Sequence, residues 1–159
     1  MKLKTERKLI KRELNKPKHH IDTGVIIEAT KETNISTFCE NYLKLIGCKY
    51  RGCFSIPMLG ELFLKTYGDI KDEVERELFF RWVFEFVEHK NVSFYSLRDL
   101  SLPFELTKID GRVKGIDALI LASAIKDKAT LITLDTDLLK SEEIKRKYKV
   151  KILTPKHFV

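Results

Sequence analysis

Residues 115–125 form a helix-length segment that is apolar on nearly every side, and a short apolar strand at 130–134 follows it. A helix without a polar face has to be buried. A short strand without polar alternation is typical of a parallel sheet that is covered on both faces. This pair of segments therefore predicts a buried helix packed on a central parallel sheet.

The rest of the chain alternates strands with helices, which indicates the α/β class and a sandwich around that sheet. Strands are expected to close at 20–22 and to run over 48–55, 92–96 and 150–153. A first helix is expected before Pro17, ending near Asn15. One helix should run from a cap at Asn34 or Ser36 to Gly47, and another should cover 70–88 with Asp69 as its cap. Further helices are expected at 24–29, 57–68, 102–109 and within 135–147.

Composition limits the class of protein. Hydrophobic residues make up 43% and charged residues 33% of the 159 residues, which is the balance of a soluble globular domain. No apolar run approaches the ~20 residues of a membrane span, and no apolar segment follows the basic N-terminus as a secretory signal would require. Three cysteines without CxxC spacing, Cys39, Cys48 and Cys53, argue against a disulfide framework and a zinc site. We expect small buried side chains in a cytoplasmic protein.

Positive charge is concentrated at the start of the chain. The formal net charge is +7, and residues 1–18 hold eight Lys or Arg against two Glu, so this arm carries six of the seven net charges. A basic arm favours an anionic partner such as nucleic acid. A solvated or frayed helix is an equal alternative. Leu3, Ile10 and Leu14 form a thin stripe that could instead dock the arm on the body, and a transit peptide is a weaker third interpretation.

The segment 70–88 carries a wide apolar stripe, and Phe80 and Phe84 fall outside it, four residues apart. These two aromatic side chains fit either packing on two sides of one monomer or a homodimer surface. The sequence favours neither alternative.

Several acidic residues lie at the ends of apolar strands or in the first turns of helices: Asp22, Glu61, Asp117, Asp135 and Asp137. In open parallel sheets, sites form beyond the carboxyl ends of the strands. Clustered carboxylates in apolar surroundings repel one another, and a hard divalent cation with oxygen ligands relieves that repulsion. The pattern therefore predicts a Mg²⁺ or Mn²⁺ site. The alternative is that each acid separately caps a helix or turn.

The sequence resembles the PIN domain, the nuclease fold of VapC-type toxins and of several RNA-processing enzymes. The resemblance rests on five segments, 20–23 (HIDT), 55–62 (SIPMLGEL), 115–124 (GIDALILASA), 131–138 (LITLDTDL) and 153–158 (LTPKHF). It covers residues 19–159 as one PIN-like nuclease domain and implies a three-layer α/β/α sandwich. Residues 1–18 form a basic extension, expected to be helical, whereas toxin-type members usually begin almost at the first strand.

The resemblance also assigns roles to residues. The four acidic positions of the family fall on Asp22, Glu61, Asp117 and Asp135, and Asp137 matches an additional acidic or amide position. All would be metal ligands, directly or through water, and Glu61 could instead orient the attacking water. The hydroxyls of Thr133 and Thr23 match positions that support the ligands. For Thr133, a plain β-branched strand residue is an equally good interpretation.

The implied activity is Mg²⁺- or Mn²⁺-dependent endonucleolytic cleavage of RNA, with one metal ion or two. The partners that the resemblance implies are RNA and an antitoxin-like inhibitor. The aromatic residues of the 70–88 helix add a second copy of the chain as a further candidate. The competing function is a non-catalytic RNA-binding scaffold of the same fold with a structural metal. A DxD phosphatase is set aside, because Asp135 and Asp137 stand near the end of the chain and not on its first strand. His19 and His20 are expected on opposite faces of a strand, so neither is assigned to the site.

Overall fold

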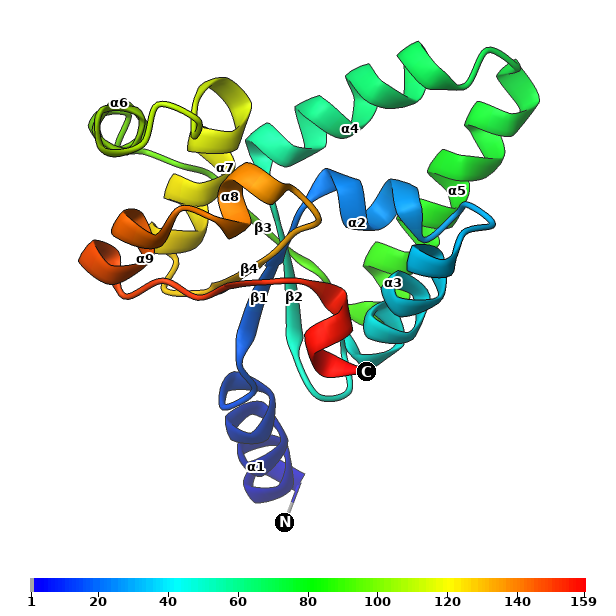
Figure 1. Ribbon diagram of the computed structural model, residues 1–159. Helices are drawn as coiled ribbons and strands as arrows, with labels where there is room; N and C mark the ends of the chain where they lie inside the picture. The colour runs from blue at the N-terminus through cyan, green and yellow to red at the C-terminus, as the bar shows by residue number, and fades with distance from the viewer. Residues whose placement is uncertain (1) are drawn as a thin grey trace.

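The computed structural model describes residues 2–159; Met1 and the side chains of Lys2 and Lys4, which belong to the expected basic arm, lie outside the described part. A parallel sheet with strand order β3-β2-β1-β4-β5 forms the centre of the molecule (Figure 1). Its strands are β1 (Lys18–Ile21), β2 (Arg51–Ser55), β3 (Ser93–Tyr95), β4 (Thr130–Ile132) and β5 (Ile152–Leu153). The expected parallel sheet is confirmed.

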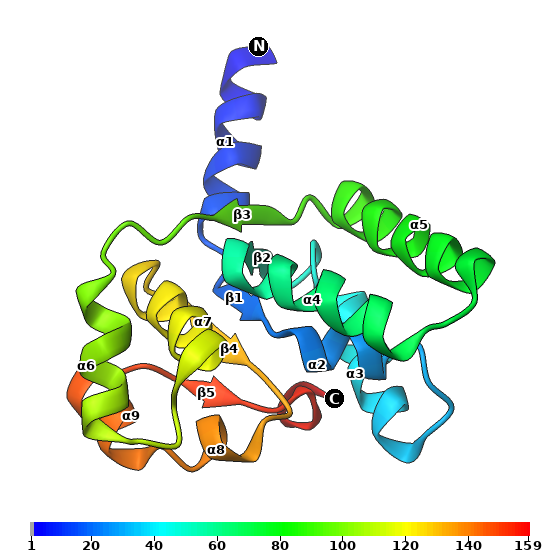
Figure 2. The same cartoon turned by 90° about the horizontal axis from the view of Figure 1, so that it is seen from above.

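Helices cover both faces of this sheet and complete the three layers (Figures 1 and 2). One layer holds α6 (Ser101–Ile109), α7 (Gly115–Lys126) and α9 (Glu142–Tyr148). The other holds α2 (Thr23–Glu28), α3 (Asn34–Leu45) and α5 (Glu73–Lys90). At the carboxyl ends of the strands lie α4 (Ile56–Asp69) and α8 (Thr136–Leu139), and the chain closes with the 3-10 turn η1 (Pro155–Phe158). Within residues 2–159, every helix is too short or too polar to cross a membrane.

The buried helix and strand that constrain the fold are both present, although β4 ends at Ile132, two residues earlier than predicted. On α7, the residues Ala118, Ile120, Leu121, Ala122 and Ala124 are all at most 2% exposed. In β4, Leu131 and Ile132 are fully buried. The strand pairs with β1 on one side and β5 on the other, so both of its edges are covered. The buried core therefore includes β4 and extends to the carboxyl end of this strand.

The basic arm forms α1 (Lys2–Leu14), which ends just before Pro17 as expected. It projects from the end of the sheet where the strands begin, away from the body in both views (Figures 1 and 2). Leu3, Ile10 and Leu14 are 74%, 58% and 60% exposed, so these side chains are not docked on the body in this structure. The division into an arm and a domain at residue 18 remains a proposal.

Two helix caps differ from the sequence prediction. Thr33, not Asn34 or Ser36, caps α3, and Ser36 completes a capping box with it: each side chain accepts from the other residue's amide, at 3.1 Å. Asp72, not Asp69, caps α5 and accepts from the amide of Glu75 at 2.9 Å. In each case several capping residue types stand close together, and propensity alone does not select among them.

The 48–55 strand was predicted too long. The chain turns after Gly47, whose φ is +80°, and the amides of Cys48, Lys49 and Tyr50 all donate to the carbonyl of Leu45. These hydrogen bonds close a turn, so the strand begins only at Arg51. Cys39 and Cys53 are buried as expected, whereas Cys48 in this turn is exposed.

The two aromatic residues outside the α5 stripe have different surroundings. Phe80 stacks on Phe63 of α4 with ring centroids 4.6 Å apart, so it packs within the monomer. Phe84 is 61% exposed. The helix therefore combines internal packing with an exposed aromatic side chain.

Candidate metal centre

Asp22 sits at the junction between β1 and α2. Its amide donates to the carbonyl of Ile132 at 2.9 Å, which extends the pairing of β1 with β4 by one residue. Its Oδ1 accepts the amide of Thr23 at 2.8 Å and caps α2. Its Oδ2 accepts the hydroxyl of Thr133 at 2.5 Å. With the residue only 6% exposed, both carboxylate oxygens are held in place.

Thr133 joins this acid to the next one. Its buried Oγ1 donates to Asp22 and also accepts the amide of Asp135 at 2.9 Å. Asp135 caps α8, because its Oδ1 accepts the amides of Asp137 and Leu138 at 2.8 and 2.9 Å. Asp135 can therefore cap α8 and also belong to the acidic set. The hydroxyl of Thr23 donates to the carbonyl of Met58 at 3.3 Å and ties α2 to α4.

Glu61 projects from the second turn of α4. The helix begins at a Ser55 cap with Pro57 in its first turn, a position where proline loses no hydrogen bond. Glu61 is half-buried and forms an ion pair with Lys65, one turn further on, with Oε1 and Nζ 2.8 Å apart. From the sequence, Lys65 is expected to be a solvated surface residue, with contact to a substrate phosphate as the alternative. The i,i+4 spacing to Glu61 was the available signal.

Asp117 lies in the first turn of α7, which starts at Gly115 with a φ of +57°. Burial raises the pKa of this carboxyl, and the negative charges of Asp135, Glu61 and Asp137 raise it further, while Lys65 acts in the opposite direction. The four acidic residues of the predicted set therefore share one electrostatic field. They come from both sides of the switch between β1 and β4, where sites in parallel sheets form.

Burial raises the pKa of Asp22 to about 6, and the charges of Glu61 and Asp117 add to the increase. Hydrogen bonds from Thr133 and Thr23 act in the opposite direction, because they stabilise the ionised form. Ionising this carboxyl in the metal-free protein is consequently costly. A cation near it would remove that cost.

The carboxylates of the acidic set are not drawn tightly together in this structure. The one group of three His, Cys, Asp or Glu residues that the described part of the chain brings within 4.8 Å is His20, Cys53 and Asp127. No three of the carboxylates of Asp22, Glu61, Asp117 and Asp135 come within 4.8 Å of one another. Their donor atoms are all oxygens, and Mg²⁺ and Mn²⁺ prefer oxygen ligands. By donor chemistry and by electrostatics, these residues fit a hard divalent cation.

The two histidines of β1 point to opposite faces, as predicted. His19 lies in an aromatic cluster, with its ring 4.2 Å from that of Tyr50 and its Nδ1 3.0 Å from the hydroxyl of Tyr42. His20 instead pairs with Asp127 on the other face. Neither histidine contacts the acidic set.

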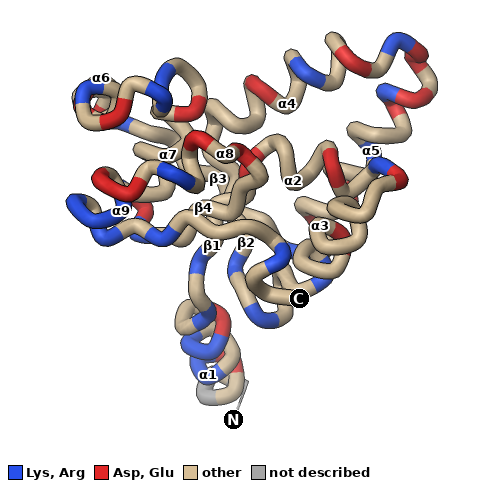
Figure 3. Tube along the Cα trace, in the orientation of Figure 1, with Lys and Arg blue, Asp and Glu red and all other residues tan. Residues whose placement is uncertain are grey.

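The two ends of the sheet differ in charge (Figure 3). Asp and Glu gather where the strands end, around α8, and Lys and Arg dominate α1 at the opposite end. The basic arm is therefore remote from the acidic set along the direction of the strands.

Comparisons with known proteins identify the family and the fold. The family model of the PIN domain matches residues 20–147. FitAcB from Neisseria gonorrhoeae has a TM-score of 0.63 at 17% identity, over 88% of this chain and 99% of that chain. VapBC2 from Rickettsia felis, bound to a DNA fragment from its promoter, has a TM-score of 0.57 at 19% identity, over 86% of this chain and 98% of that chain. VapBC-1 from nontypeable Haemophilus influenzae has a TM-score of 0.54 at 19% identity, over 87% and 98%. These structures are similar in fold, and no curated protein matches the chain.

Proposed function

Because this chain belongs to the PIN-domain family, we propose that it is a divalent-metal-dependent endoribonuclease whose site is formed by Asp22, Glu61, Asp117 and Asp135. The observation that carries the proposal is the shared electrostatic field of these acids around the buried Asp22. Cleavage of RNA by the purified full chain, in Mn²⁺ and then in EDTA, tests it.

Each residue has a distinct task in this mechanism. Asp22, Asp117 and Asp135 would hold Mg²⁺ or Mn²⁺, with Asp137 as an additional ligand at the exposed rim. When bound, such a cation lowers the pKa of a coordinated water and offsets the charge that builds up on the phosphorane. Thr133 keeps Asp22 oriented through its 2.5 Å hydrogen bond. Glu61 either joins the ligands or orients the attacking water.

Lys65 supplies the counter-charge of the metal-free site. Burial lowers the pKa of this lysine, but its hydrogen bond to Glu61 and the charges of Glu61, Asp22 and Asp117 outweigh burial and raise it. The ammonium group therefore stays charged beside the acids. This ammonium group competes with a divalent cation for the negative charge of the acidic residues. It is also placed to attract a substrate phosphate.

Replacing Lys65 by Met should tighten Mn²⁺ binding at pH 8 by roughly 3- to 10-fold, because a positive charge leaves the site. The same variant should raise KM for RNA. Calorimetric Mn²⁺ titration and steady-state kinetics measure the two effects. Lys147→Met is the matched control, since Lys147 pairs with Glu105 on the surface. Unchanged Mn²⁺ affinity in Lys65→Met would contradict the counter-charge role.

The competing proposal is a non-catalytic RNA-binding scaffold with a structural metal. The projecting basic helix α1 favours RNA binding under either proposal. Turnover separates the two, because a scaffold binds RNA without cutting it.

The arm can be tested for RNA contact in an Asp117→Asn background, where cleavage should be suppressed. Replacing Arg7, Lys8 and Arg12 by Gln should weaken binding mainly at low salt. Each lost phosphate contact on single-stranded RNA should reduce the salt slope by about 0.7. Deleting residues 1–16 should have a larger effect in the same direction. An unchanged affinity and slope in both variants would show that the arm does not contact RNA.

A protein partner would use the apolar surface of α4 and α5. Leu64, Tyr67, Leu78 and Phe84 are each more than half exposed on these two helices, and exposed apolar surface is what a protein interface covers. We assign this surface to a homodimer contact. Resemblance to the VapC-type proteins makes an antitoxin-like inhibitor the alternative occupant.

A further inference from the structure

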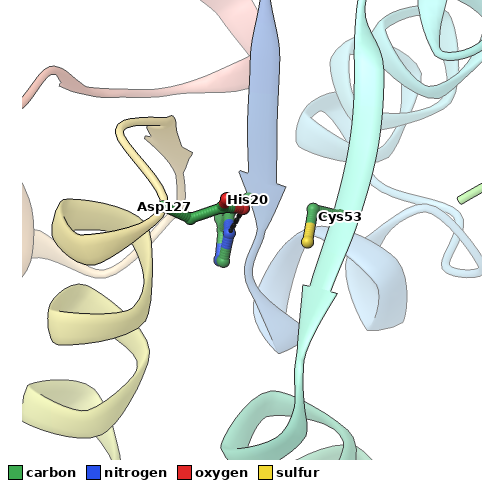
Figure 4. Close-up of side chains that lie close together, drawn as sticks. All are labelled: His20, Cys53 and Asp127. Carbon is green, nitrogen blue, oxygen red and sulfur yellow. Dashed lines mark hydrogen bonds and ion pairs between the residues drawn. The ribbon is translucent and has the colours of Figure 1, made fainter. Parts of the chain in front are cut away.

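A second cluster of potential ligands lies on the α7 face of the sheet (Figure 4). His20 of β1 and Cys53 of β2 are directly paired in the parallel register, so their side chains stand side by side on one face. Asp127 follows the last turn of α7 and reaches them from above the sheet. Three elements that are far apart in the sequence thus meet here.

The three side chains are close together and almost completely buried. His20 and Cys53 are each 1% exposed. The side chain of Asp127 is 12% exposed, and its Oδ2 lies 2.8 Å from Nε2 of His20. One ligand atom from each residue lies within 4.8 Å of the other two. A cation could be bound by all three after small side-chain movements.

The hydrogen bond between His20 and Asp127 marks the place where a cation would bind. A carboxylate only accepts hydrogen bonds, so Asp127 fixes the proton of a neutral imidazole on Nε2. A cation that replaced this proton would be bound by Nε2 and by the carboxylate together. Nδ1 is buried and has no hydrogen-bond partner, so its lone pair is free to take up the displaced proton.

Lys18 and the Cys53 thiol set the electrostatics of the cluster. Lys18 donates to the other oxygen of Asp127 at 2.6 Å. Although burial raises the pKa of Asp127, the hydrogen bonds from His20 and Lys18 outweigh burial and hold that pKa below its usual value. Burial raises the pKa of the Cys53 thiol to about 11, so the metal-free protein keeps a neutral thiol. On metal binding, the thiol proton passes to solvent and a metal–thiolate bond replaces the S–H bond.

The geometry points to a zinc site formed by His20, Cys53 and Asp127, separate from the acidic centre. One thiolate, one imidazole and one carboxylate are ligands that Zn²⁺ accepts together, whereas Mg²⁺ prefers oxygen alone. The lack of CxxC spacing argues against a zinc site built on paired cysteines, whereas only one cysteine takes part here.

Zinc here would join β1, β2 and the carboxyl end of α7. Asp117 lies at the other end of the same helix, about 15 Å away along its axis. The site would therefore anchor the helix that carries a proposed catalytic acid, without touching that acid. It does not depend on whether the protein cleaves RNA.

Cobalt substitution tests the site in the full-length chain. Co²⁺ bound to a thiolate gives a near-ultraviolet charge-transfer band, and the all-oxygen acidic centre cannot produce one. We expect one equivalent of Co²⁺ to give this band in the wild type and one equivalent of Zn²⁺ to abolish it. Cys53→Ser should lack the band, and Asp127→Asn should bind Co²⁺ at least 10-fold more weakly.

Two controls make the result specific. Cys48→Ser removes an exposed thiol, and the double variant Glu61→Gln, Asp117→Asn disables the acidic centre; both should keep the band. Circular dichroism establishes that each variant is folded. A wild type without the band at millimolar Co²⁺, or a band that persists in folded Cys53→Ser, would overturn the proposal.

Discussion

Replacing Asp117 by Asn should lower RNA cleavage by at least about 1,000-fold, because the substitution removes a metal ligand from the site. The side chain volume hardly changes. No hydrogen bond within residues 2–159 depends on the Asp117 carboxylate, so the fold should be retained. A fluorescent RNA cleavage assay in Mn²⁺ measures the rate, and circular dichroism monitors folding.

Asp117 is a cleaner choice than Asp22 for this experiment. Asp22 accepts hydrogen bonds from Thr23 and Thr133, and an amide offers only one acceptor oxygen for these two donors. Asp22→Asn would therefore combine lost ligation with a damaged helix cap.

The matched control is Asp72→Asn, which exchanges an exposed cap of α5 for an equally good cap. It should cleave like the wild type. If Asp117→Asn also cleaved at the wild-type rate, the activity would belong to a contaminant or to a different site.

The order of elements could be predicted because the hydrophobic pattern reflects burial in the sheet. The apolar α7 and β4 segments are buried on all sides only when other helices and strands pack around them, as in a sheet covered by helices on both faces. The boundaries were less predictable. Asp69 and Asp72 are chemically equivalent caps, and α4 continues through Asp69 because the amide of Ile70 still donates to Thr66.

The candidate acids could be predicted because the carboxyl ends of parallel strands meet at one edge. Asp22 and Asp135 follow neighbouring strands, so their proximity is a consequence of topology. The His20, Cys53 and Asp127 cluster has no such sequence signal. Its members meet only through the β1–β2 register and the position at which α7 ends, and neither is readable from residue spacing.

A raised pKa at Asp22 links the acidic centre to stability. In the metal-free protein, this pKa is about 6, against an ordinary value of 3.8 for an aspartic acid. The folded state therefore binds more protons than the unfolded state between these two values, so stability falls as pH rises from about 4 to about 6. The shift of about two pH units corresponds to at most ~3 kcal/mol. Thermal melts in EDTA across this range should show the decline.

Metal should reverse this loss at neutral pH. At 100 times its Kd, Mn²⁺ stabilises the folded state by about 2.7 kcal/mol, which is a rise in Tm of roughly 5–10 °C for a chain of this size. Asp117→Asn should gain less than half of that rise. The variant removes one of the repelling charges that raise the pKa of Asp22, so in EDTA at pH 7.5 it should be at least as stable as the wild type.

A model in which each acid only caps its own helix gives the opposite result. Asp117→Asn would then lose the favourable charge at the N-terminus of α7 and with it about 0.3–1 kcal/mol, and Mn²⁺ would leave both Tm values unchanged. Cys53→Ser separates the two metal sites, because it should keep the full Mn²⁺ response of the acidic centre. A wild type whose Tm is insensitive to millimolar Mn²⁺ at pH 7.5 would rule out metal binding by Asp22, Glu61, Asp117 and Asp135, and the carboxylates would then be explained by capping alone.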